Sequence, residues 1–100
     1  MSGELQIADI RQCLAKHQDD LTRLGVAALR LFGSHARGEA RAGSDIDLLV
    51  AFKGPASFDA YMDLKFLLED MLGRRVDLVT ESALRTQLKS RIDQESVRVA

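Results

Sequence analysis

The stretch that most restricts the possible folds is Ile46–Phe52, IDLLVAF, an apolar run with one interruption, at Asp47. Strands of this kind are buried on both faces, so other elements must cover them. Elsewhere in the chain, short apolar runs alternate with segments of helical spacing. We expect strands at Val26–Phe32, Ile46–Phe52 and 75–80, helices at 5–24, 57–72 and 81–91, and an edge strand or a partner-docking segment at 95–100. This alternation predicts a mixed α/β (α+β) domain with a small sheet of three to four strands flanked by helices.

Length and composition narrow the functional classes. The 100 residues form a single domain, 1–100, and 46% hydrophobic with 29% charged residues is typical of an ordinary globular protein. The formal net charge of -1 provides no basic field for bulk nucleic acid. No apolar window approaches the length that spans a bilayer, and the N-terminus lacks a basic segment followed by an apolar stretch. We therefore expect a cytoplasmic protein that does not contact membranes.

Two carboxylates, Asp45 and Asp47, stand one residue apart at the start of the most apolar strand. Because side chains alternate along a strand, both point to the same face, roughly 7 Å apart. Removing them from water is costly unless a cation or strong donors receive them. Oxygen ligands select Mg²⁺ or Mn²⁺ over Zn²⁺. If the strand 75–80 neighbours this one, Asp77 completes an acidic, metal-binding cluster.

Upstream of these acids, Gly33 and Ser34 lie where the strand Val26–Phe32 turns into a short helix. Free main-chain N–H groups and the helix dipole favour phosphate at such a turn, and glycine permits close approach. A phosphate cradle facing metal-binding carboxylates suits nucleotidyl transfer, with Asp77 as a metal ligand or general base. Each acid taken alone also has a simpler explanation: Asp45 could serve merely to cap a turn, and Asp77 could lie on an exposed edge strand. Gly33 and Ser34 could likewise form only a turn and a helix cap.

The pattern Gly33-Ser34, ten further residues and Asp45-x-Asp47 resembles the signature of the DNA polymerase β-type nucleotidyltransferase superfamily. The segment FGSHARGEARAGSDIDLLV, with the later VDLV, is similar to the minimal nucleotidyltransferases (MNT), and the likeness covers almost the whole chain. It implies the nucleotidyltransferase fold. The resemblance assigns phosphate binding to Gly33, Ser34 and Arg37, and metal binding and catalysis to Asp45, Asp47 and Asp77. By the residues alone, Arg37 and Arg41 are equally compatible with a solvated helix face.

The same resemblance implies an antitoxin that transfers AMP from ATP to a tyrosine of a HEPN-domain toxin and so neutralises it. Its substrate would be ATP, its cofactor Mg²⁺ or Mn²⁺, and its partner the toxin in a hetero-oligomer. The length agrees with a protein partner as the acceptor, because 100 residues leave no room for a separate acceptor-binding domain. Two alternatives stay open. The chain could be a catalytically silent antitoxin that occludes its partner, or a small-molecule nucleotidyltransferase acting with a separate acceptor-binding subunit.

Overall fold

The computed structural model describes residues 6–36, 38, 45–83, 92 and 94–100, which are built around a mixed four-stranded sheet. The strands lie in the order β3-β2-β1-β4, with β1 antiparallel to β2 and β4, and β2 parallel to β3. Their bounds are Val26–Phe32 for β1, Ile46–Phe52 for β2, Val76–Thr80 for β3 and Val97–Arg98 for β4. The expected mixed α/β architecture is confirmed, and the C-terminal segment forms an edge strand.

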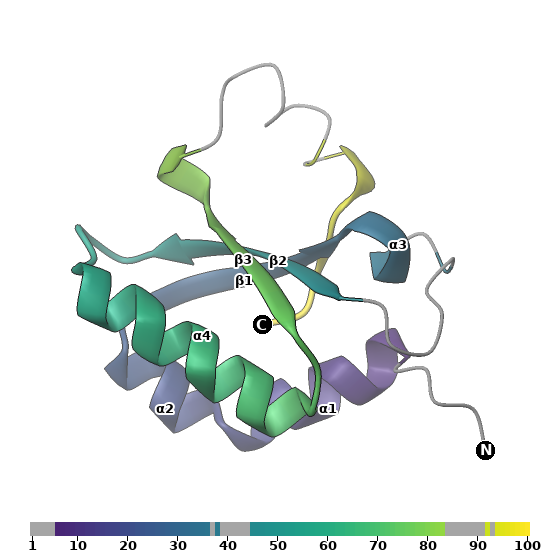
Figure 1. Ribbon diagram of the computed structural model, residues 1–100, viewed down its shortest axis with the longest axis horizontal. Coiled ribbons are helices and arrows are strands. Elements are labelled where there is room, and N and C mark those ends of the chain that lie inside the picture. The colour runs from purple at the N-terminus through teal and green to yellow at the C-terminus, as the bar shows by residue number, and fades with distance from the viewer. Residues whose placement is uncertain (1–5, 37, 39–44, 84–91, 93) are drawn as a thin grey trace.

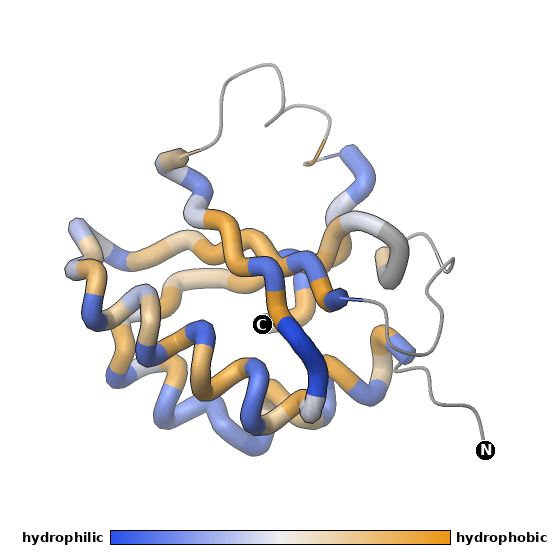
Figure 2. Tube along the Cα trace, viewed as in Figure 1, coloured by the Kyte–Doolittle hydropathy of each residue, from blue (hydrophilic) through white to orange (hydrophobic). Residues whose placement is uncertain are grey.

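Three helices cover one face of this sheet: α1 (Ile7–Lys16), α2 (Gln18–Arg23) and α4 (Phe58–Leu72). In Figure 1 all three lie on the same side of the strands, whereas the short α3 (Gly33–Ala36) lies at the end of β1. Figure 2 shows that β1 and β2 are hydrophobic along most of their length, while the helices alternate between hydrophobic and hydrophilic residues. This distribution is expected where amphipathic helices cover an apolar sheet.

The core lies between the helices and alternate residues of the strands. Leu31, Leu48 and Leu78 are direct cross-strand partners with 0%, 0% and 4% of their surface exposed. The helices contribute a matching set of buried residues: Ile10 and Leu14 from α1, Leu21 from α2, and Leu64, Leu68 and Leu72 from α4. Because side chains have a period of two along a strand, the residues between these core positions project from the opposite face.

Helix α4 also closes the outer edge of β3. Ser57 caps its N-terminus by accepting a hydrogen bond from the Ala60 amide, and Gly73 ends it with φ of 64°. From within this helix, the Tyr61 hydroxyl donates to the Leu78 carbonyl, and a Glu69 carboxylate oxygen accepts from the Val76 amide at 3.0 Å. Main-chain groups of an edge strand would otherwise be open to pairing with another chain.

The structure differs from the sequence prediction in three segments. The helix expected over 5–24 is divided at His17, where φ of -112° and ψ of 22° separate α1 from α2. The strand expected over 75–80 begins one residue later, at Val76. The helix expected over 81–91 is described only as a 3-10 turn, Glu81–Ala83, and its remainder lies outside the described residues. None of the helices in the described ranges combines the length and apolar character that a membrane crossing requires.

Candidate functional site

Three residues form one cross-strand row on the face of the sheet opposite the core. Phe32 of β1 is the partner of Asp47 of β2, and Asp47 is in turn the partner of Asp77 of β3. Neighbouring strands are about 4.8 Å apart, so the two aspartates emerge side by side from adjacent strands. The sequence predicted this only on the condition that the strands be neighbours, and the register fulfils that condition.

Asp45 lies one residue before the start of β2 and adds a third carboxylate to the site. The amide of Ile46 donates to the carbonyl of Arg75 at 2.9 Å, which holds the residues before β2 and β3 together. Asp45 and Asp47 are two residues apart and therefore project to the same face, about 7 Å from each other. Asp45 and Asp77 are exposed, whereas Asp47 is half-buried. The site is thus open to an incoming ligand at Asp45 and Asp77 and supported by the protein at Asp47.

Gly33 is where the main chain comes up against the Asp47 carboxylate. It follows Phe32 directly, has φ of 73°, and begins α3, which contacts both β1 and β2. A Cβ atom added to Gly33 would lie 3.1 Å from Cγ and 3.3 Å from Cβ of Asp47, and closer still to Oδ2. Glycine is therefore required here for two reasons: the left-handed backbone and the lack of space for a side chain.

The donor set suits a hard divalent cation, because three carboxylates supply only oxygen ligands. Gly33 contributes to this fit because the space beside the Asp47 carboxylate stays free, whereas any larger residue at position 33 would fill it. In the described part of the chain, however, no three Asp, Glu, His or Cys side chains approach closely enough to surround a metal ion. The register thus places Asp47 and Asp77 on adjacent strands, with Asp45 just before β2, but their carboxylates are not gathered around one point.

The other predicted site residues are located less fully. Ser34 belongs to α3, but its side chain and the whole of Arg37 lie outside the described residues. The register adds one residue that the sequence did not single out. Arg30 lies two positions before Phe32 on β1 and therefore projects from the same face as Asp47. Its partner on β4 is Arg98, and no pattern in the sequence could reveal that pairing.

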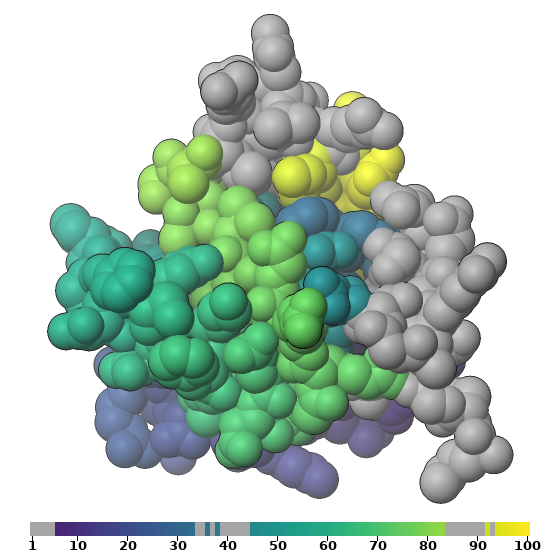
Figure 3. All heavy atoms as spheres, viewed as in Figure 1, coloured from purple at the N-terminus to yellow at the C-terminus, as the bar shows by residue number. Residues whose placement is uncertain are grey.

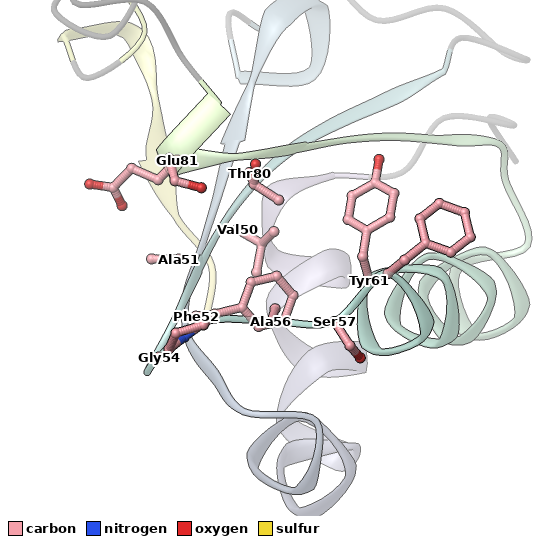
Figure 4. A pocket seen from close by; sticks show the side chains of 12 residues that line it. Val50, Ala51, Phe52, Gly54, Ala56, Ser57, Tyr61, Thr80 and Glu81 are labelled. Atoms are coloured by element: carbon pink, nitrogen blue, oxygen red, sulfur yellow. The ribbon is translucent and has the colours of Figure 1, made fainter.

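A pocket of about 650 Å³ lies at the other end of β2 and β3, between those strands and the start of α4. Figure 4 shows Phe52, Tyr61, Thr80 and Glu81 around it. Asp47 is five residues from Phe52, which corresponds to about 17 Å along the strand. Of the predicted site residues that the structure describes, Gly33, Asp45, Asp47 and Asp77, none lines this pocket. The row of Phe32, Asp47 and Asp77, called the acidic row below, is therefore separate from the pocket.

Comparisons with known proteins bear on this site. Residues 10–100 match a family model described as "Nucleotidyltransferase domain". The protein adenylyltransferase MntA of Thermococcus cleftensis is 38% identical over 96 residues, which cover 95% of this chain and 97% of that protein. A solved structure of a "putative minimal nucleotidyltransferase" is 37% identical with a TM-score of 0.81, covering 94% of this chain and 96% of its own.

A more distant neighbour is a complex of a tri-AMPylated Shewanella oneidensis HEPN toxin with an MNT antitoxin. The matching chain is 22% identical with a TM-score of 0.65, and the alignment covers 91% of this chain and 71% of that one. At this level of identity the similarity concerns the fold alone. Together, the close relatives account for nearly the full length of the present chain, so the acidic row lies within the matched region.

Proposed function

The chain belongs to the nucleotidyltransferase domain family, and on this premise we propose that it transfers AMP from ATP to a protein acceptor. The observation that carries the proposal is the pairing of Asp47 with Asp77 on adjacent strands, with Gly33 against the Asp47 carboxylate. Support for AMP as the transferred group comes from the relative named as a protein adenylyltransferase, which matches this chain over 95% of its length. We further propose that the acceptor is a tyrosine of a cognate HEPN-domain toxin, which the modification neutralises.

In the proposed reaction, the acceptor hydroxyl oxygen bonds to the α-phosphorus of ATP. The bond between that phosphorus and the oxygen bridging to the β-phosphate breaks, and pyrophosphate leaves with its electron pair. Asp45, Asp47 and Asp77 would hold Mg²⁺ or Mn²⁺. When bound, such an ion offsets charge on the triphosphate and lowers the pKa of an attacking hydroxyl.

Within this mechanism the protein's own residues position the reactants. The main chain at Gly33 can approach a phosphate closely because it carries no side chain. Exposed Asp77 can receive the proton of the acceptor hydroxyl, since it lies on the open face beside Asp47. ATP and a protein acceptor meet in the cytoplasm, which is where we propose that the reaction occurs.

The test uses the purified chain, its cognate HEPN-domain toxin, α-³²P-labelled ATP and Mg²⁺. The wild-type chain should label the toxin, and the double variant Asp45→Asn with Asp47→Asn should lose the signal. Asp63→Asn provides a matched control, because Asp63 is an exposed carboxylate on α4, on the side of the sheet that carries the helices. Normal labelling by the double variant would show that the acids are assigned wrongly.

The same variants separate the alternative functions. If the double variant fails to label its partner but still binds it and protects cells, the chain acts by occlusion. Labelling of a nucleotide or aminoglycoside acceptor without the toxin would instead indicate a small-molecule nucleotidyltransferase. Removal of Mg²⁺ with EDTA should abolish labelling in the wild type, and addition of Mg²⁺ or Mn²⁺ should restore it. Labelling that continues in excess EDTA would contradict the assigned donor set.

A further inference from the structure

Two arginines face each other across the edge of the sheet. Arg30 of β1 and Arg98 of β4 are direct partners in the antiparallel register, so their side chains leave the same face. Like charges at directly opposed positions are destabilising. Arg30 donates from Nη1 to the Ser96 hydroxyl at 3.3 Å, and Arg98 donates from Nε to the Ala100 main-chain oxygen at 3.1 Å. The ion pair that the structure shows among its described residues joins Arg23 to Asp20 and involves neither of these arginines.

This arginine pair lies in the row next to the acids. Arg30 is also the partner of Leu49 on β2, and Leu49 is two residues from Asp47 on the same face. The two rows are therefore about 7 Å apart along the strands. Long arginine side chains can cover that distance. In Figure 3 the C-terminal residues, in yellow, lie at the surface beside the blue residues of β1.

The C-terminal strand holds Arg98 in this place. Although β4 has only two residues, the Leu29 amide donates to the Ala100 oxygen at 3.0 Å and the Val99 amide donates to the Leu29 carbonyl at 2.9 Å. Arg11 of α1 donates from Nε and Nη2 to the Arg98 carbonyl at 3.3 and 3.1 Å. Val99, with 7% of its surface exposed, belongs to the core. The position of Arg98 is thus fixed by the sheet.

We propose that Arg30 and Arg98 form a phosphate subsite next to the acidic row, on the face of the sheet opposite the helices, where Arg98 is exposed. The inference rests on the proposed function, because the ligand is a phosphate group of a nucleotide bound at that row. A divalent ion at the acids offsets only part of the charge of a triphosphate. The guanidinium groups of Arg30 and Arg98 would exchange their present partners, the Ser96 hydroxyl and the Ala100 oxygen, for the remaining phosphate oxygens, which they would meet through charge-assisted hydrogen bonds. The bound anion would also relieve the repulsion between the two arginines.

The phosphate could come from the donor ATP or from an AMP group already attached to the acceptor. Equilibrium titrations with ATP, inorganic tripolyphosphate and AMP, each with Mg²⁺, distinguish these sources. The variants are Arg30→Gln, Arg30→Lys and Arg98→Gln. Arg23→Gln is the control, because Arg23 is an exposed arginine of α2 on the helical side of the sheet, paired with Asp20 at 2.9 Å.

We expect Arg30→Gln and Arg98→Gln each to weaken ATP and tripolyphosphate binding about tenfold, the effect of losing one charged hydrogen bond. Arg30→Lys should fall between them and the wild type, and Arg23→Gln should bind as the wild type does. If AMP binding is unchanged, the subsite takes the outer phosphates of the donor. If AMP binding weakens equally, the subsite takes a nucleotide monophosphate, as on an acceptor that already carries AMP.

Equal affinities of the wild type, Arg30→Gln and Arg98→Gln for all three ligands would overturn the subsite. If the wild type binds tripolyphosphate but neither ATP nor AMP, the proposed function fails. The subsite would still be tested, by comparing the tripolyphosphate affinity of the wild type with that of Arg30→Gln and Arg98→Gln. Thermal unfolding gives a second readout that needs no catalysis. Tripolyphosphate should raise the Tm of the wild type more than that of either variant. Because Arg98 is exposed, Arg98→Gln keeps this test open even if Arg30→Gln fails to fold.

Discussion

Replacement of Gly33 by alanine provides the sharpest test of the site, because the structure separates two effects of the new methyl group. The first is backbone strain: Gly33 has φ of 73°, and a left-handed conformation costs an L-residue about 1–2 kcal/mol. The second is a steric clash with Asp47, whose Cβ and Cγ would lie 3.3 and 3.1 Å from the new carbon. Rotation of the carboxylate alone does not relieve a contact that includes Cβ.

Gly73→Ala is the matched control. Gly73 also has a left-handed backbone, with φ of 64°, but a Cβ atom there would meet nothing within 4 Å. It therefore reports the strain without the clash. We expect Gly73→Ala to lower the free energy of unfolding by about 1–2 kcal/mol and to leave AMP transfer per folded molecule unchanged.

Gly33→Ala should lose at least as much stability and, in addition, about a hundredfold in the rate of AMP transfer, the scale expected when a reacting group is displaced by about 1 Å. Urea denaturation measures the stability of both variants, and labelling of the acceptor from ATP measures the rate. The rates are compared at a temperature at which both variants are folded. Equal loss of stability and equal activity in the two variants would refute the close approach of Gly33 to Asp47 as a requirement of the site.

Three further substitutions have effects that can be worked out from the contacts. Asp77→Asn should abolish transfer yet raise metal-free stability by about 0.5 kcal/mol, because it removes a like charge opposite Asp47; a variant less stable than wild type in EDTA would contradict this. Ser57→Ala should cost about 1 kcal/mol in urea denaturation, since it deletes the N-cap of α4, while transfer stays normal. Tyr61→Phe should cost about 1 kcal/mol by removing the hydrogen bond to the Leu78 carbonyl, and hydrogen exchange should increase along β3 while remaining unchanged in β1.

The sequence predicts the central strands well because each is a short apolar run with a glycine or proline close to its end. Two expected strands, Val26–Phe32 and Ile46–Phe52, have the predicted bounds. The division of the first helix at His17 leaves no trace in the apolar spacing, because Leu14 and Leu21 are seven residues apart and stay in phase across it. The structure shows the local cause, since the His17 amide donates to the Leu14 carbonyl and its Nδ1 lies 3.0 Å from the Cys13 carbonyl oxygen.

The candidate site likewise contains residues whose position follows from the local sequence and residues whose position depends on long-range strand pairing. Asp45 and Asp47 are adjacent along one strand, so their common face follows from alternation alone. The neighbourhood of Asp47 and Asp77 depends on β2 and β3 being parallel and in register, which is a property of the sheet. The pairing of Arg30 with Arg98 depends on a two-residue strand at the far end of the chain. Its short length gives no periodicity from which it could be predicted.

The alternation of side chains also explains how aspartates can occupy strands that are otherwise apolar. Asp47 lies between Ile46 and Leu48, both with 0% of their surface exposed, and these neighbours point into the helical core while Asp47 points away from it. A shift of β2 by one residue would send Asp47 into that core and expose both neighbours, so hydrophobic burial opposes the shift strongly. The same reasoning applies to Asp77 between Val76 and Leu78. The core face therefore fixes the register, and the register in turn holds the two acids side by side on the open face.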